Sequence, residues 1–175
     1  MVNYIGGQFV ANTNEQVSIL QSGFGKSCES KVILHPLETA YLLSFGLIEV
    51  YENKKKMNID QILKTFKTKV PKSIGKLPSA NEQFMLYSNL RSAGRIVHFN
   101  AHSVQYWRVY ARGVGREQER AQILLRLVDS KWGVSIKSLN MQIAVARQLR
   151  MELVLAFVDE NKTPAFVKVN KFNLD

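Results

Sequence analysis

The segment 107–128, WRVYARGVGREQERAQILLRLV, combines a tyrosine with several arginines between two apolar stretches. Tyr110 supplies a phenol, whereas Arg112, Arg116 and Arg120 supply guanidinium groups, which stay protonated and hold phosphate or carboxylate anions. A free phenol has a pKa of about 10 and is a poor base at pH 7. No histidine follows Tyr110 in this segment, so the side chain that most readily exchanges protons near neutral pH is missing. These residues predict that the segment binds an anion without converting it.

The charge balance also favours a polyanionic partner. The 175 residues include 24 Lys and Arg against 14 Asp and Glu, which gives a formal charge of +10 and a pI near 9.8. Contacts between these cations and phosphates release counterions, so nucleic acid is the predicted ligand class. The alternative is a basic surface that is only solvated. With 46% hydrophobic residues the chain can bury a core, which argues against disorder.

Cys28 is the only cysteine. A single thiol excludes an intramolecular disulfide, and without a cluster of Cys and His it provides no zinc site. The sequence opens without a basic segment followed by an apolar one, and no apolar run approaches about 18 residues. We therefore expect a cytoplasmic protein that needs no metal ion or other cofactor and does not contact a membrane.

The first half of the chain is expected to form a small sheet with two helices. Short apolar runs between turn residues predict strands at 7–12, 17–20 and 31–36. Apolar residues at helical spacing predict a helix at 37–46, opened by a proline, and another at 59–70, capped by an asparagine. The lysine run between these helices fits a solvated loop.

The segment 70–80, VPKSIGKLPSA, holds prolines and a glycine among polar residues and is the expected linker between two domains, 1–78 and 81–175. The second domain is expected to run helix, three strands, helix, two strands, with Ser135 as the cap of the later helix. The predicted fold class is therefore mixed α/β or α+β: a small α+β domain followed by a domain whose mixed central sheet is flanked by helices.

Four stretches in this order resemble the archaeal tRNA-splicing endonuclease family. LHPLETAYLLSFGLIEVY is similar to the family's strand, proline-led helix, glycine and strand. YSNLRSAGRIV resembles its tyrosine, Leu-Arg pair and glycine before a strand, and WRVYARG resembles its tyrosine-bearing strand. MELVLAFVDE is similar to its strand that leads into an acidic loop. The resemblance runs from about residue 24 to 169 and implies that the second domain is endonuclease-like.

The family resemblance implies metal-independent cleavage of the bulge-helix-bulge of precursor tRNA by a tyrosine, a histidine and a lysine. A ribose 2′-OH attacks the adjacent phosphate, so one group must accept its proton and another must protonate the leaving 5′-oxygen. A cation must stabilise the negative charge that gathers on the phosphoryl oxygens. The products would be a 2′,3′-cyclic phosphate and a 5′-OH.

Transferred to this chain, the family's triad is incomplete. Tyr110 stands at the position of the tyrosine, but Arg120 stands where the histidine is expected and Met151 where the lysine is expected. A guanidinium does not release its proton near neutral pH and a thioether has no charge. No catalytic residue is therefore expected, although His98 and His102 remain candidates for a rearranged site if they could reach Tyr110 from a strand that pairs elsewhere.

A catalytically empty member resembles the structural subunit of the heterotetrameric enzymes, in which two catalytic and two structural chains assemble as α2β2. The resemblance implies pairing of the C-terminal strand, through Phe166, Val167 and Val169, with a neighbouring chain. It also implies that an acidic loop, Asp159 and Glu160, enters a basic cleft of another subunit, although these residues equally suit an ordinary hairpin turn. The reciprocal cleft, for a partner loop or for RNA, would be formed by Arg112, Arg116, Arg120, Arg147 and Arg150.

Three functions remain open on the sequence. The first is a structural subunit that binds a catalytic subunit and precursor tRNA, with self-association through the C-terminal strand as an additional option. The second is an active metal-independent RNA endonuclease with a rearranged triad, and the third is a basic RNA-binding module unrelated to cleavage. Cleavage by the purified chain would favour the second, and a monomer that binds RNA without a partner would favour the third.

Overall fold

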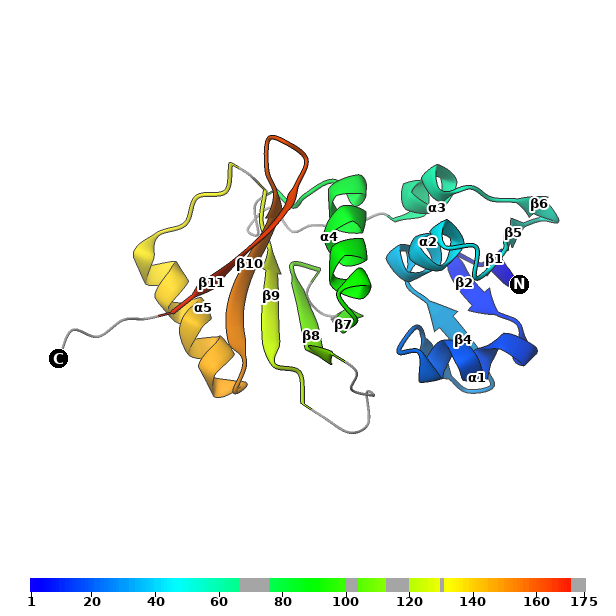
Figure 1. The fold of residues 1–175 in the computed structure, drawn as a ribbon, viewed down its shortest axis with the longest axis horizontal. Coiled ribbons are helices and arrows are strands. Elements are labelled where there is room, and N and C mark those ends of the chain that lie inside the picture. Colours follow the sequence, from blue (N-terminus) through cyan, green and yellow to red (C-terminus); the bar gives the residue numbers. More distant parts are fainter. Residues whose placement is uncertain (67–75, 100–103, 113–119, 130, 171–175) are drawn as a thin grey trace. The chain divides into compact units, whose positions relative to one another are not determined.

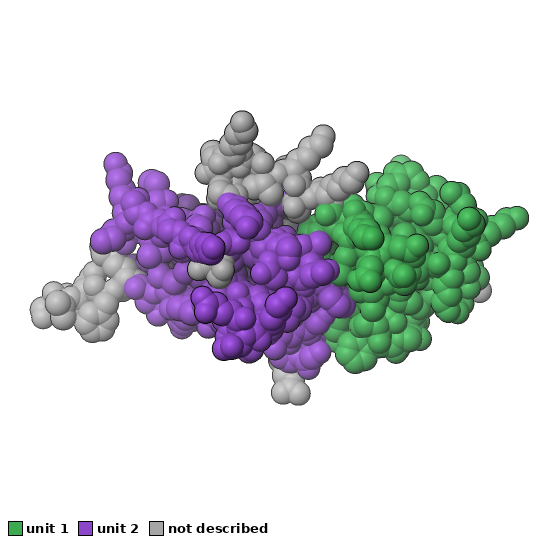
Figure 2. Space-filling view, turned by 90° about the horizontal axis from the view of Figure 1, so that it is seen from above, with its two compact units in different colours: residues 1–68 green, residues 69–175 purple. Residues whose placement is uncertain are grey.

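The computed structural model describes residues 1–66, 76–99, 104–112, 120–129 and 131–170. The chain divides into two compact units, Met1–Thr68 and Lys69–Asp175, each with its own sheet (Figure 1; Figure 2). Helices and mixed sheets occur in both units, which confirms the expected mixed α+β class. Their roles as two domains divided between residues 78 and 81 stay a prediction.

The first unit contains a six-stranded sheet in the order β3-β4-β2-β1-β5-β6. β1 and β5 pair in parallel, whereas the other neighbours are antiparallel. Phe9, Leu37 and Ile62 are fully buried in its core. The elements are β1 (Val2–Ile5), β2 (Gln8–Ala11), α1 (Thr13–Gln21), β3 (Lys26–Cys28), β4 (Lys31–Leu34), α2 (Pro36–Ser44), β5 (Val50–Glu52), β6 (Lys55–Lys56) and α3 (Ile59–Thr65).

Side-chain caps fix where α2 and α3 begin. His35 Nδ1 accepts the backbone N–H of Leu37 at 3.3 Å, and the carboxylate of Glu38 accepts the N–H of His35 at 2.8 Å. Asn58 forms the same reciprocal pair with the third residue of α3. Both caps satisfy N–H groups that the helix itself leaves without acceptors. The predicted starts of these two helices are confirmed.

The strand expected at 17–20 is wrong, because these residues belong to the helix α1. Three apolar residues within four positions, Val17, Ile19 and Leu20, are too few to separate a strand from a helix. In the helix, Ile19 is 6% exposed and packs inward, whereas Val17 is 64% exposed. Residues two apart share a face in a strand but lie on opposite sides of a helix, so the opposite burial of Val17 and Ile19 fits the helix.

The second unit contains a five-stranded sheet in the order β11-β10-β9-β8-β7. β9 and β10 pair in parallel and α5 crosses between them, while the other neighbours are antiparallel. The predicted succession of helix, three strands, helix and two strands is confirmed. The elements are α4 (Ala80–Ser92), β7 (Arg95–Phe99), β8 (Tyr106–Arg112), β9 (Ile123–Leu127), α5 (Ile136–Gln148), β10 (Glu152–Val158) and β11 (Pro164–Val169).

The two helices of this unit cover opposite faces of its sheet (Figure 1). Tyr87 of α4 makes an edge contact with Trp107, at 6.3 Å between ring centroids. Ile143 of α5 packs in a cluster with Leu124 and Leu153. Side chains alternate between faces along a strand, so Tyr106, Arg108 and Tyr110 of β8 lie on the α5 side. Among the described helices, none is long and apolar enough to span a bilayer.

Candidate functional site

The three positions of the expected triad meet where β8, β9 and β10 adjoin. The backbone N–H of Gln122 donates to the carbonyl of Val109 at 3.1 Å, and the Gln122 carbonyl accepts the N–H of Glu152 at 2.8 Å. These bonds place residues 120–122 between the strand that carries Tyr110 and the turn that carries Met151. The sheet topology therefore gathers residues that are up to 41 positions apart in the sequence (151 − 110).

Tyr110 lies in a small apolar cluster and is 8% exposed. Ile96 and Ala121 are buried with it, and the partly buried Met151 packs against this cluster. The ring of His98 makes an edge contact with the Tyr110 ring, at 5.0 Å between centroids. The phenol therefore contributes mainly to packing on this face of the sheet.

Neither of the other two positions carries a group that transfers protons at neutral pH. Arg120 is exposed and directly precedes the buried Ala121. Met151 is held by a backbone hydrogen bond from its N–H to the Ala146 carbonyl, at 2.8 Å, where α5 ends. Its thioether fills space beside Tyr110 and provides no cation for a phosphoryl group. Among the three positions, only Arg120 carries a cation that could hold an anion.

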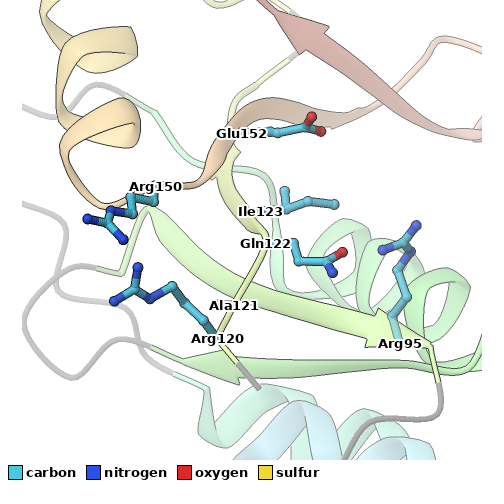
Figure 3. Close-up of a pocket in the computed structure, with 7 residues that line it drawn as sticks. All are labelled: Arg95, Arg120, Ala121, Gln122, Ile123, Arg150 and Glu152. Carbon is cyan, nitrogen blue, oxygen red and sulfur yellow. The ribbon is translucent and has the colours of Figure 1, made fainter. Parts of the chain in front are cut away.

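A basic pocket of about 570 Å³ opens beside this junction (Figure 3). Arg95 comes from the start of β7, Arg120 from the approach to β9, and Arg150 from the turn between α5 and β10. Glu152 also lines the pocket, but its carboxylate pairs with Lys168 at 2.5 Å. The remaining lining residues are Ala121, Gln122 and Ile123.

The pocket overlaps only partly with the predicted basic cleft. Arg120 and Arg150 line it, whereas Arg147 lies on α5 and is not among its lining residues. Arg112 ends β8, and Arg116 lies outside the described residues. Arg95 was missed because it precedes Tyr110 by 15 residues (110 − 95) and reaches the pocket only through the β7–β8 pairing. In the sequence, Arg95 is distinguished only by its place directly after Gly94, the glycine that follows the end of α4.

The expectation that His98 would lie on a strand that pairs elsewhere is wrong. β7 pairs directly with β8, with His98 opposite Arg108, so His98 and Tyr110 lie on the same face. The pairing could not be read from the sequence, because the order of strands in a sheet depends on contacts between distant residues. His102 lies outside the described residues.

The predicted acidic loop is a tight hairpin turn. Asp159 Oδ1 accepts the N–H of Thr163 at 2.8 Å, and the Asp159 carbonyl accepts the N–H of Lys162 at 3.0 Å. Lys162 has a positive φ of 60°. Glu160 is exposed at the tip. Asp159 therefore shapes the turn, and Glu160 is the carboxylate that extends into solvent.

β11 is the outer strand of its sheet, and it contains the residues predicted to pair with another chain. Val167 is 48% exposed and Phe166 is half-buried, whereas Val169 packs against the cluster beneath α5. The Asp159 N–H donates to the carbonyl of Thr163, which makes these two residues a hydrogen-bonded pair. In an antiparallel ladder every second pair is hydrogen-bonded, and the residues between them turn their N–H and C=O groups away from the neighbouring strand. By this alternation, the N–H groups of Phe166 and Lys168 point to the open edge.

Comparison with known proteins agrees with the fold and with the order of the sequence stretches. Residues 6–63 match the family model described as tRNA intron endonuclease, N-terminal domain. A tRNA-splicing endonuclease of Thermococcus kodakarensis is 27% identical over 174 residues, which cover 97% of this chain and 96% of that protein. Over nearly its whole length the chain is therefore similar to tRNA-splicing endonucleases. A tRNA-splicing endonuclease of Pyrococcus horikoshii is 26% identical over 95% of this chain and 93% of its own length.

The family also includes longer proteins that match this chain over part of their length. A tRNA-splicing endonuclease of Methanosarcina acetivorans is 23% identical over 94% of this chain, but the match covers 44% of that protein. The similarity to tRNA-splicing endonucleases therefore extends over nearly the whole of this chain and over both of its compact units.

Proposed function

We propose that this chain is a non-catalytic structural subunit of a tRNA-splicing endonuclease. It would assemble with catalytic chains as an α2β2 heterotetramer in the cytoplasm. The complex would cleave bulge-helix-bulge introns from precursor tRNA and leave 2′,3′-cyclic phosphate and 5′-OH ends. The observation that carries this proposal is the set of residues at the triad positions: Tyr110 is buried in apolar packing, Arg120 cannot release a proton, and Met151 has no charge.

The open edge of β11 supports assembly with another chain. An outer strand presents unpaired N–H and C=O groups that a strand of a partner can complete. The exposed Val167 would pack against the partner, and Phe166 and Val169 would set the register through alternation. Glu160, at the tip of the turn that Asp159 shapes, would enter a basic cleft of another subunit.

Cleavage of a labelled bulge-helix-bulge RNA tests this function. The RNA is incubated with this chain alone, with a catalytic relative that contains all three triad residues, and with the two together. Native mass spectrometry of the same samples reports the number of chains in each complex. Faster cleavage and a four-chain mass that appear only in the mixture are the expected results. Cleavage by this chain alone would contradict the proposal.

A second function, an active endonuclease with a rearranged site, is favoured by the contact between His98 and Tyr110. An imidazole and a phenol on neighbouring strands are both groups that exchange protons. Single-turnover cleavage by this chain and by its His98→Ala variant separates the two functions. Cleavage that disappears in the variant would establish the second function, whereas no cleavage by either protein supports the first.

A further inference from the structure

Arg126, in the middle of the second unit's sheet, is a buried cation without a buried anion. It is 8% exposed and forms no ion pair with any described carboxylate. Its Nη1 donates to the Tyr106 hydroxyl at 3.3 Å, whereas the buried Nε–H has no acceptor among the described residues. A guanidinium has five N–H donors and stays protonated, and buried charges in proteins are normally paired. Within the described chain, Arg126 therefore lacks its counter-ion.

Two aromatic rings hold the Arg126 guanidinium in position. Its Cζ lies 4.8 Å from the centre of the Trp132 ring and 5.7 Å from the centre of the Tyr106 ring. Such cation–π contacts stabilise the charge over the ring faces, but they use none of the N–H donors, which lie in the plane of the guanidinium. Tyr106 and Trp132 therefore fix the side chain and leave N–H donors for an acceptor from outside this cluster.

A row of side chains leads from Arg126 to the open edge of the sheet. Arg126 lies between Tyr106 of β8 and Leu155 of β10, and Leu155 lies opposite Val167 of β11 (Figure 1). We call these four residues the Arg126 row. The last three each lie two positions from a residue of the apolar packing beneath α5, so the row shares that face of the sheet. Leu155 is half-buried and Val167 is 48% exposed, so an apolar surface connects Arg126 to the outer strand.

A second copy of this chain does not supply the missing counter-ion. Symmetric pairing through β11 would place the same face of each copy in one interface. The Arg126 row contains no Asp or Glu, so two copies would bring two guanidinium groups to that interface without an anion, which is unfavourable. A different chain with a carboxylate in the facing segment would neutralise the charge and accept charge-assisted hydrogen bonds from the free donors. The row therefore distinguishes between partners by their charge.

We propose that the Arg126 row is a docking surface for an unlike chain of the assembly. That chain places an Asp or Glu carboxylate against Arg126 and apolar side chains against Leu155 and Val167. The carboxylate accepts hydrogen bonds from the guanidinium, while Tyr106 and Trp132 hold the guanidinium in position. The row thereby selects an unlike partner over a second copy. The identity of this partner as a catalytic chain rests on the proposed function, whereas the requirement for a carboxylate does not.

The test measures association of the full chain, by itself and with the catalytic relative, by sedimentation equilibrium and native mass spectrometry. The variant Arg126→Met removes the charge and keeps an unbranched side chain. The matched control is Arg108→Met, which removes an exposed arginine from the same face of β8. Thermal unfolding of each protein reports on its fold. Replacing a buried charge by an apolar side chain is often neutral or stabilising, so both variants are expected to remain folded.

The wild-type chain is expected to bind the catalytic relative and to remain monomeric by itself. Arg126→Met should raise the Kd for the catalytic relative at least about 30-fold, because the partner's carboxylate loses its counter-ion at a buried site. Arg108→Met should stay within about twofold of the wild type, because exposed charges contribute little. Without its charge the row no longer opposes self-pairing, so Arg126→Met should also dimerise at concentrations at which the wild type is a monomer.

Equal affinities of Arg126→Met and Arg108→Met for the catalytic relative would overturn the proposal and leave the proposed function intact. A wild-type chain that pairs with itself as tightly as with the catalytic relative would also overturn it, because a second copy would then occupy the row. If the wild type does not bind the catalytic relative at all, the proposed function is contradicted. Self-association then decides on the row: dimers of Arg126→Met but not of the wild type support the role of Arg126, and monomers of both overturn it.

Discussion

Replacing Lys168 with proline tests whether the open edge of β11 joins this chain to its partner. The Lys168 N–H points away from β10, so proline removes a donor that the fold itself does not use. Proline is also tolerated at sheet edges. Lys168→Ala is the matched control, because it keeps the backbone N–H and removes only the side chain with its ion pair to Glu152.

The expected magnitude follows from the loss of one donor at the interface. The partner's carbonyl would be buried without a hydrogen bond, which costs about 1–3 kcal/mol and raises the Kd for assembly about 5- to 150-fold. The ion pair removed by both variants is formed by side chains that are 49% and 53% exposed. Exposed pairs of this kind contribute about 0–1 kcal/mol to stability, and this one lies within the chain. Lys168→Ala should therefore assemble with a Kd within about twofold of the wild type.

The assay is titration of the catalytic relative against each variant, followed by native mass spectrometry or analytical ultracentrifugation. Thermal unfolding of the isolated variants shows whether each one retains its fold. If Lys168→Pro is folded and binds the catalytic chain as tightly as Lys168→Ala does, then β11 does not mediate assembly and the reasoning is refuted.

Three further predictions concern single side chains. Arg150→Gly should raise the free energy of unfolding by up to about 1 kcal/mol, because it removes left-handed strain at φ 55°, and a lower value in chemical denaturation would contradict this. Burial lowers the pKa of His35 to about 3 from the ordinary 6.5, so the unfolded chain binds a proton that the folded chain excludes between these values. Stability should therefore decline as the pH falls through this window, by up to about 3 kcal/mol at pH 4, with partial exposure of the ring reducing the effect. His35→Asn keeps a capping acceptor that does not titrate, and equal pH profiles of denaturant midpoints for both proteins would disprove this role. Tyr110→Phe should leave the cleavage rate of the mixed complex within about twofold, and a loss of about 100-fold would show that this phenol takes part in catalysis.

Local signals allowed parts of the fold to be predicted from the sequence. Asn58 and Ser135 accept backbone N–H groups three residues later, and such caps depend only on neighbouring residues. The helix at 17–20 was missed because a short apolar run fits either periodicity.

The candidate site depended on contacts between distant residues. Tyr110, Arg120 and Met151 were found through family resemblance, since nothing local connects them. Arg95 and the contact of His98 with Tyr110 were missed because both depend on the pairing of β7 with β8. Sequence patterns indicate which residues form a strand, but not which strand lies beside it.

At Gln122 the backbone holds the sheet together, whereas the side chain lines the pocket. Its N–H and carbonyl connect β8 to β10, while its side chain faces the pocket and takes no part in that connection. The N–H of Met151 likewise closes α5 whatever side chain the residue carries. Substitutions at these positions can therefore change what the site binds or catalyses without removing the backbone hydrogen bonds that hold the sheet. A lineage can lose catalysis in this way and still retain a protein that assembles.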